Sequence, residues 1–104
     1  MSTESNVVEL TFDDRGGDGR IAWVTFNNPT KRNALGLAGK DLFFEIMTDL
    51  KHDETLRAVV LTGAGDKSFV GGSNLAEMAQ YDLAKAEASA TKTHRACDSV
   101  RQFP

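Results

Sequence analysis

The sequence predicts an α/β fold, and three observations support this. Segments rich in β-branched and aromatic residues at 7–12 and 21–27 predict two strands. A continuous apolar run at 57–63 has the length of a strand in a sheet covered on both faces. Apolar residues at intervals of three and four predict helices at 36–51 and 82–103. Strands that alternate with helices along the chain are typical of this class.

The first two strands are expected to pair as an antiparallel hairpin. The segment between them, DDRGGDGR at 13–20, supplies glycines for a turn. In the returning strand, Ala22, Val24 and Phe26 share one face, opposite Ile21, Trp23 and Thr25. A loop is expected next, because Pro29 disfavours helix at the residue before it. The first helix follows this loop.

Two further helices are expected after the third strand. A short helix covers 75–80, and a long one covers 82–103. One side of the long helix is predicted to pack against the rest of the fold. It carries Leu83, Ala86, Ala90, Cys97 and Val100. No strand is predicted after residue 62, although an apolar strand needs neighbours. We therefore expect residues 1–104 to form the N-terminal part of a larger domain.

Composition limits the classes of function. The chain has 104 residues, of which 40% are hydrophobic, and a net charge of −3, so a nucleic-acid or anionic-membrane surface is not expected. Cys97 is the single cysteine, which favours a reducing, cytoplasmic compartment. The sequence shows neither the pattern of a signal peptide nor an apolar run of membrane-spanning length.

The glycine-rich stretch after the third strand, TGAGDKSFVGGSN at 62–74, does not match a phosphate-binding loop. Asp66 stands where a P-loop needs glycine, next to Lys67. The dinucleotide pattern meets Ser68 in place of its third glycine. The nucleophile elbow pattern fails at Leu75. A nucleotide-binding domain is thereby disfavoured.

No metal site is predicted. His52 and His94 fall on different elements, and one cysteine gives no paired spacing. His94 is interpreted as a surface histidine, and Cys97 as a small buried side chain on a helix.

Two motifs at a defined separation carry a family resemblance. The first contains Asn27, Pro29 and the run Asn33-Ala34-Leu35. The second runs from Val60-Leu61-Thr62-Gly63 through Phe69 and Gly72 to Leu75, Glu77 and Met78. Together with the helix between them, they resemble the N-terminal part of the enoyl-CoA hydratase/isomerase (crotonase) family.

The resemblance implies a spiral of ββα units, assembled as a homotrimer or homohexamer. It also implies a pocket for an acyl-CoA thioester, with coenzyme A entering as part of the substrate and no permanently bound cofactor. In that family two backbone N–H groups stabilise a thioester enolate, and the resemblance assigns the first of them to Ser73. The second donor and the acids and bases of the family come later in the chain.

The residues around Ser73 agree with a backbone oxyanion donor. An amide aimed at the carbonyl oxygen stabilises developing charge, and one such donor is worth about 10²–10³ in rate. Gly71 and Gly72 leave room for the thioester, and Ser73 or Asn74 is a suitable N-cap for the helix starting at Leu75. The positive end of that helix would favour the oxyanion. The alternative interpretation is an ordinary loop and helix cap.

Two positions depart from the family pattern. Ser73 replaces a small apolar residue, and Asn74 replaces aspartate. The first change keeps the backbone N–H, whereas the second removes a carboxylate. The resemblance further assigns contacts with coenzyme A to Lys31 and Arg32, with Ala34 and Leu35 lining the same groove. A solvated pair of cations on a polar loop explains Lys31 and Arg32 equally well.

The sequence therefore predicts an acyl-CoA-processing enzyme, most simply a 2-enoyl-CoA hydratase or isomerase. The 104 residues alone are expected to be inactive, a prediction that turnover of crotonyl-CoA by the segment would refute. The alternative is a non-catalytic module of the same fold that docks on complete partners. Binding of acetoacetyl-CoA would favour the enzyme, and binding of ATP or NAD would favour a nucleotide-binding domain.

Overall fold

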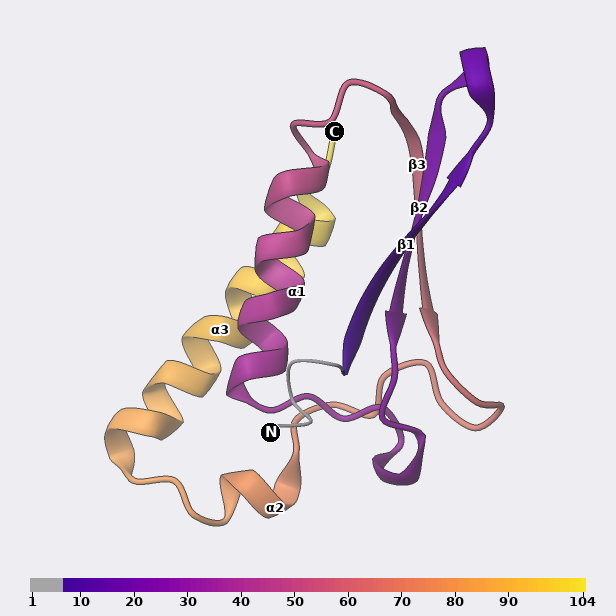
Figure 1. Cartoon of the computed structure of the whole chain (residues 1–104). Coiled ribbons are helices and arrows are strands. Elements are labelled where there is room, and N and C mark those ends of the chain that lie inside the picture. The colour runs from indigo at the N-terminus through magenta and orange to yellow at the C-terminus, as the bar shows by residue number, and fades with distance from the viewer. Residues whose placement is uncertain (1–6) are drawn as a thin grey trace.

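The computed structural model describes residues 7–104, which form one three-stranded sheet and three α-helices (Figure 1). The elements follow in the order β1 (Val8–Asp14), β2 (Arg20–Phe26), α1 (Leu37–Leu50), β3 (Leu56–Gly63), α2 (Leu75–Met78) and α3 (Leu83–Arg101). Short 3-10 turns lie at Gly16–Asp18 and Pro29–Lys31. The predicted α/β class and every predicted element are present.

The strands lie in the order β1-β2-β3. The predicted hairpin is confirmed, because β1 pairs with β2 antiparallel, with Val8 opposite Phe26 and Thr11 opposite Trp23. β3 pairs with β2 in parallel, with Ala22 opposite Val59. The parallel pair requires a crossover, and α1 provides it between the two strands.

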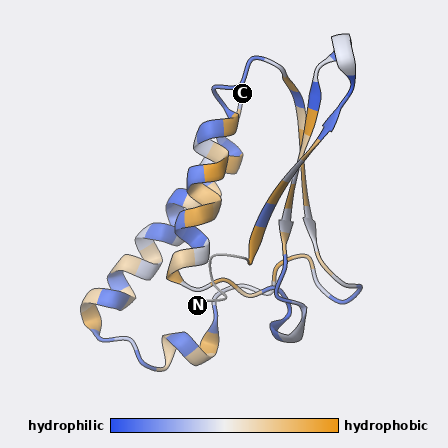
Figure 2. Cartoon of the chain, viewed as in Figure 1, coloured by the Kyte–Doolittle hydropathy of each residue, from blue (hydrophilic) through white to orange (hydrophobic). Residues whose placement is uncertain are grey.

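The core lies between the sheet and α1. Ala22, Val24 and Phe26 are buried on the face predicted for them, and Phe43 and Met47 of α1 pack in the same cluster. Burying a side chain of this size contributes about 1.5–3 kcal/mol. Figure 2 shows hydrophobic residues along β1 and along the neighbouring α1.

The long helix α3 packs on α1 rather than on the sheet (Figure 1). Charged side chains contribute to the contact between the helices: the Nζ of Lys92 lies 2.6 Å from an Asp41 carboxylate oxygen, and the Arg95 guanidinium lies 4.2 Å from the Phe44 ring centroid. No helix among residues 7–104 has both the length and the apolar character needed to cross a membrane.

The predicted packing face of α3 is wrong. Leu83 is 76% exposed, Val100 is 43% exposed, and Cys97 is exposed rather than buried. The buried residue of α3 is Ser89, and Thr93 and Ala96 beside it are partly buried. α3 carries alanines on several sides, so its apolar pattern gives little contrast between its faces.

Candidate functional site

Asn33 holds the two sequence motifs together. Its side chain is 1% exposed, and its Oδ1 accepts a hydrogen bond from the Asn28 backbone N–H at 2.8 Å. Its Nδ2 lies 3.0, 2.9 and 3.2 Å from the carbonyl oxygens of Ala64, Ser68 and Phe69 in the glycine-rich loop. A single amide therefore fixes the position of that loop against the loop that follows β2.

A backbone bridge aligns Ser73 with the first motif. The Leu35 N–H donates to the Gly72 carbonyl at 2.8 Å, and the Asn74 N–H donates to the Leu35 carbonyl at 2.9 Å. These two bonds form a short parallel pairing of Leu35 with Ser73. Because successive N–H groups of an extended chain point to opposite sides, the Ser73 N–H faces away from Leu35.

The Ser73 amide is available to a ligand in the described part of the chain. Within residues 7–104 its N–H donates no hydrogen bond, whereas the amides of Leu35 and Asn74 beside it are both engaged. An unpaired amide next to cavities is a feature that a ligand oxygen can satisfy.

Positions 71 and 72 each require glycine, for different structural reasons. Gly72 has φ of +101°, a conformation that L side chains rarely adopt. At Gly71 a Cβ would approach the Arg32 carbonyl oxygen to 2.6 Å. The glycine pair therefore lets the chain turn into Ser73 while packing closely against Arg32.

Two cavities meet at Ser73. The cation-lined groove has a volume of about 620 Å³ and is lined by Lys31, Arg32, Ala34, Gly71, Ser73, Asn74, Leu75, Ala76 and Met78. The apolar pocket has a volume of about 410 Å³ and is lined by Phe26, Leu35, Lys40, Phe43, Leu61, Phe69, Val70, Gly72, Ser73, Thr93, Ala96, Cys97 and Val100. Ser73 lines both, so the residue lies where a ligand spanning the two cavities would cross.

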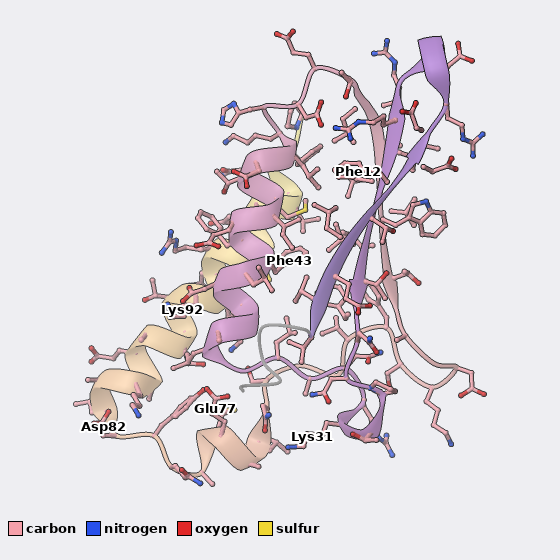
Figure 3. The ribbon with its side chains drawn as sticks, in the orientation of Figure 1. Phe12, Lys31, Phe43, Glu77, Asp82 and Lys92 are labelled. Atoms are coloured by element: carbon pink, nitrogen blue, oxygen red, sulfur yellow. The ribbon has the colours of Figure 1, made fainter. Side chains whose placement is uncertain are left out.

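The groove brings most of the sequence-predicted site residues together. Lys31 and Arg32 are exposed on its rim, and Figure 3 shows Lys31 near α2. Ala34 is buried and Leu75 is exposed along the same groove. Gly72 lines the apolar pocket instead. Their roles in binding remain a proposal.

The predicted N-cap of the short helix is present at Asn74. Its Oδ1 accepts a hydrogen bond from the Glu77 N–H at 3.2 Å. α2 has only four residues, so its dipole is small and adds little to any charge stabilisation at Ser73. The backbone N–H of Ser73 remains the candidate donor without it.

Glu77 serves a structural role at this position. Its Oε1 accepts from the Leu37 N–H at the start of α1 and from the Tyr81 hydroxyl, both at 3.1 Å. Figure 3 shows it close to the lower end of α1. The hydrogen bond from Leu37 connects α2 to the start of α1.

Lys40 is a site residue that the sequence reasoning missed. It is 4% exposed, lines the apolar pocket, and its Nζ donates to the Ser73 Oγ at 2.7 Å and to the Ser89 Oγ at 3.0 Å. Burial lowers the pKa of the Lys40 ammonium, and the Glu77 carboxylate partly offsets this. The signal was in the sequence: Lys40 lies on the same helical face as Phe43 and Met47.

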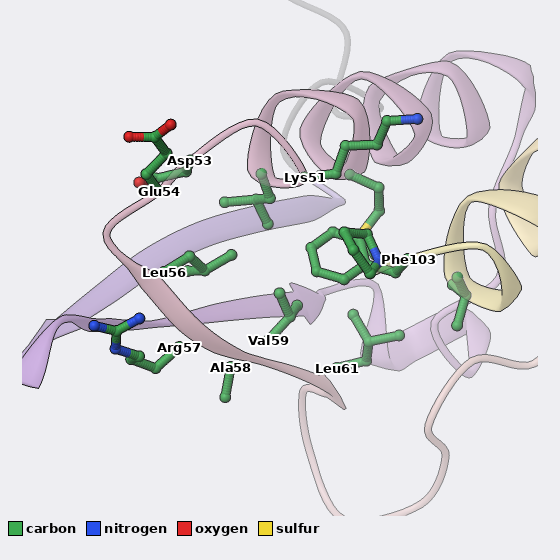
Figure 4. A pocket seen from close by; sticks show the side chains of 13 residues that line it. Lys51, Asp53, Glu54, Leu56, Arg57, Ala58, Val59, Leu61 and Phe103 are labelled. Atoms are coloured by element: carbon green, nitrogen blue, oxygen red, sulfur yellow. The ribbon is translucent and has the colours of Figure 1, made fainter.

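Another hollow lies away from Ser73 and contains none of the predicted site residues. It has a volume of about 470 Å³ between the end of α1, β3 and the end of α3 (Figure 4). Leu56, Val59 and Phe103 are among its lining residues.

In the range 7–104, no three metal-ligating side chains lie together, and His52 and His94 are on separate elements.

The fold and the paired loops define a class of protein: an α/β chain of the crotonase type. The family model for enoyl-CoA hydratase/isomerase matches residues 16–104. The chain belongs to the enoyl-CoA hydratase/isomerase family.

Curated relatives and solved structures agree with this assignment. A short-chain-enoyl-CoA hydratase of Clostridium acetobutylicum is 38% identical over 65 residues, which cover 62% of this chain and 25% of that protein. A crotonyl-CoA hydratase of Syntrophomonas wolfei is 34% identical over 70 residues, with 64% and 26% covered. The chain therefore spans about a quarter of the length of these relatives.

The solved structures cover nearly the whole chain. An enoyl-CoA hydratase of Bacillus anthracis superposes with a TM-score of 0.80 at 25% identity, covering 91% of this chain and 36% of that one. An enoyl-CoA hydratase/carnithine racemase of Magnetospirillum magneticum gives 0.77 at 32% identity, covering 94% and 36%. The crotonase-like architecture expected from the sequence is confirmed.

Proposed function

We propose that the protein containing this chain is an acyl-CoA-processing enzyme that stabilises a thioester enolate in a backbone oxyanion hole. Its simplest reaction is hydration of a 2-enoyl-CoA. The Ser73 N–H is the first donor, and the observation that carries this role is its freedom from hydrogen bonds within residues 7–104, at the junction of two cavities. Coenzyme A enters as part of the substrate, without a permanent cofactor.

The substrate spans both cavities in this proposal. The phosphates of coenzyme A lie along the cation-lined groove, where the Lys31 and Arg32 cations can bind them. The acyl group enters the apolar pocket, and the thioester carbonyl crosses at Ser73. Removal of a proton next to this carbonyl, or addition of water to the conjugated double bond, places negative charge on its oxygen. A fixed amide stabilises that charge with little reorganisation.

The remaining parts of the proposal concern the whole protein. Residues 1–104 are the N-terminal part of a crotonase-like domain, and the second donor and the groups that transfer protons lie outside them. The complete protein acts as a homotrimer or homohexamer in the cytoplasm. The isolated chain has the first donor and the groove but no turnover of its own.

Replacing one backbone amide tests the proposed donor. An ester in place of the Gly72–Ser73 amide, introduced by chemical ligation into the complete protein, removes that N–H and also weakens the Gly72 carbonyl as the acceptor of the Leu35 N–H. We expect crotonyl-CoA hydration to fall by about 10²–10³ in kcat, because one donor to the oxyanion is lost. The measurement is steady-state kinetics.

The matched control is an ester at Lys67, in the same loop but outside both cavities. The Lys67 N–H also donates no hydrogen bond in the described residues, so both replacements remove an unpaired amide. We expect the control to keep its kcat. Equal activity of the two esters would contradict the role of Ser73.

A further inference from the structure

The Lys40 ammonium is buried and forms no ion pair in the described chain, although the Glu77 carboxylate acts on it from beyond ion-pair distance. It lies between α1, the Ser73 loop and α3, where its hydrogen-bond acceptors are the hydroxyls of Ser73 and Ser89. In the described chain no acidic group lies within ion-pair distance of its Nζ. Lys92, on the same pair of helices, does have such a partner in Asp41.

Burying a cation with only neutral acceptors costs free energy. Transfer of an ammonium out of water is unfavourable unless an anion or a full set of hydrogen bonds replaces the solvent. Hydroxyls accept two of the three N–H groups of Lys40, and within residues 7–104 the third has no acceptor. The site is therefore short of negative charge on the side of the apolar pocket that Lys40 lines.

Lys40 also determines how the Ser73 hydroxyl is used. An ammonium can only donate, so the Ser73 Oγ is the acceptor of their 2.7 Å hydrogen bond. The hydrogen of that hydroxyl is then left for another acceptor, and no described residue accepts it. Two donors, one of them charged, thus lie beside the backbone N–H proposed for the thioester oxygen.

We propose that Lys40 makes the apolar pocket a binding site for acyl groups that carry a second, anionic carboxylate. A carboxylate accepts up to four hydrogen bonds, so it can accept both from the third Lys40 N–H and from the Ser73 hydroxyl. Since Ser73 supplies both this hydroxyl and the proposed oxyanion donor, only a short spacer separates the carboxylate from the thioester. The ligand is the coenzyme A thioester of a short dicarboxylic acid. This proposal rests on the proposed function, which places the acyl group in the pocket.

Two thioesters of the same shape test the proposal. Succinyl-CoA carries a terminal carboxylate, and 4-methylpentanoyl-CoA carries a neutral isopropyl group of similar shape in its place. We expect the complete protein to bind succinyl-CoA at least about tenfold more tightly in isothermal titration, because only its carboxylate can accept the charged hydrogen bond from Lys40. In the Lys40→Met variant this preference disappears or reverses.

The control is Lys92→Met, which removes an ammonium from the same helix pair outside the pocket. We expect it to keep the preference for succinyl-CoA. Equal affinities of the wild-type protein for the two thioesters would overturn the assignment of Lys40 even if the Met variant does not fold. A Lys40→Met variant that retains the preference would overturn it as well. If the wild-type protein binds neither thioester, this proposal and the proposed function both fail.

Discussion

Asn33 shows how much of the site depends on a single side chain. Its one side-chain amide forms hydrogen bonds with four backbone groups of two loops, which would otherwise lack these partners. It also adopts φ of +58°, a left-handed conformation that asparagine tolerates better than most residues. The loop that presents Ser73 therefore has its position fixed from β2 and not only from its own sequence.

Replacing Asn33 with alanine should destabilise the protein strongly. Three carbonyls and one N–H lose their partner in a buried site, and alanine is strained at positive φ. We expect the free energy of unfolding to fall by about 2–4 kcal/mol, measured by urea denaturation.

Asn27→Ala is the matched control, since the Asn27 side chain makes no hydrogen bond within the described range. A change of at most about 0.5 kcal/mol is expected there. Similar losses for the two variants would mean that Asn33 does not join the loops.

The two residues to which we assign roles in the proposed site differ in how far the sequence reveals them. Ser73 was identified through its motif, because an amide donor needs only a position in the chain. Lys40 was missed because it has no motif; a lysine on a helix usually extends into water, and only the third layer, α3, buries it. The bonding role of Asn33 was missed for a related reason, since three of its four partners are more than 30 residues away in the sequence.

At the scale of elements, strands and α1 were predictable and the orientation of α3 was not. In β2 the buried residues Ala22, Val24 and Phe26 alternate with less buried ones, and α1 has large apolar residues on one face, so local sequence determines both. α3 combines small side chains with charges, and its contacts with α1 depend on Asp41 and Phe44, which lie elsewhere in the chain. Its buried face could be learned only from the tertiary structure.

The turn between α1 and β3 gives a prediction about pH. Hydrogen bonds from the Thr55 hydroxyl and then its backbone N–H hold the pKa of Asp53 below its usual value, and the Arg20 guanidinium adds to the effect. A lowered folded-state pKa means that the unfolded chain takes up the proton first. The stabilisation is therefore present above about pH 3.9 and is lost as the pH falls through the folded-state value.

We expect Asp53→Asn to lower the urea midpoint at pH 7 and to approach the wild-type midpoint as the pH is lowered toward 2. Urea titrations across this range measure the difference. Glu54→Gln removes a neighbouring carboxylate that forms no ion pair in the described chain, and its midpoint should follow the wild type at every pH. A deficit for Asp53→Asn that stays constant down to pH 2 would refute the linkage.

At the scale of the whole molecule, the chain has the family architecture but spans only about a quarter of the length of its curated relatives. Residues 16–104 match the family model, while the aligned segments cover about a quarter of the curated relatives. The fold class and the family were predictable, because both motifs and the helix between them lie inside this span. The reaction was not, because neither motif contains a residue that we can assign as an acid or base.

The central claim is that the backbone N–H of Ser73 binds the thioester oxygen. A crystal structure of the complete protein with acetoacetyl-CoA tests it most directly. We predict the thioester carbonyl oxygen at about 2.7–3.1 Å from the Ser73 nitrogen, with coenzyme A along the cation-lined groove. A thioester oxygen bound elsewhere, with the Ser73 N–H hydrogen-bonded inside the protein, would contradict the account.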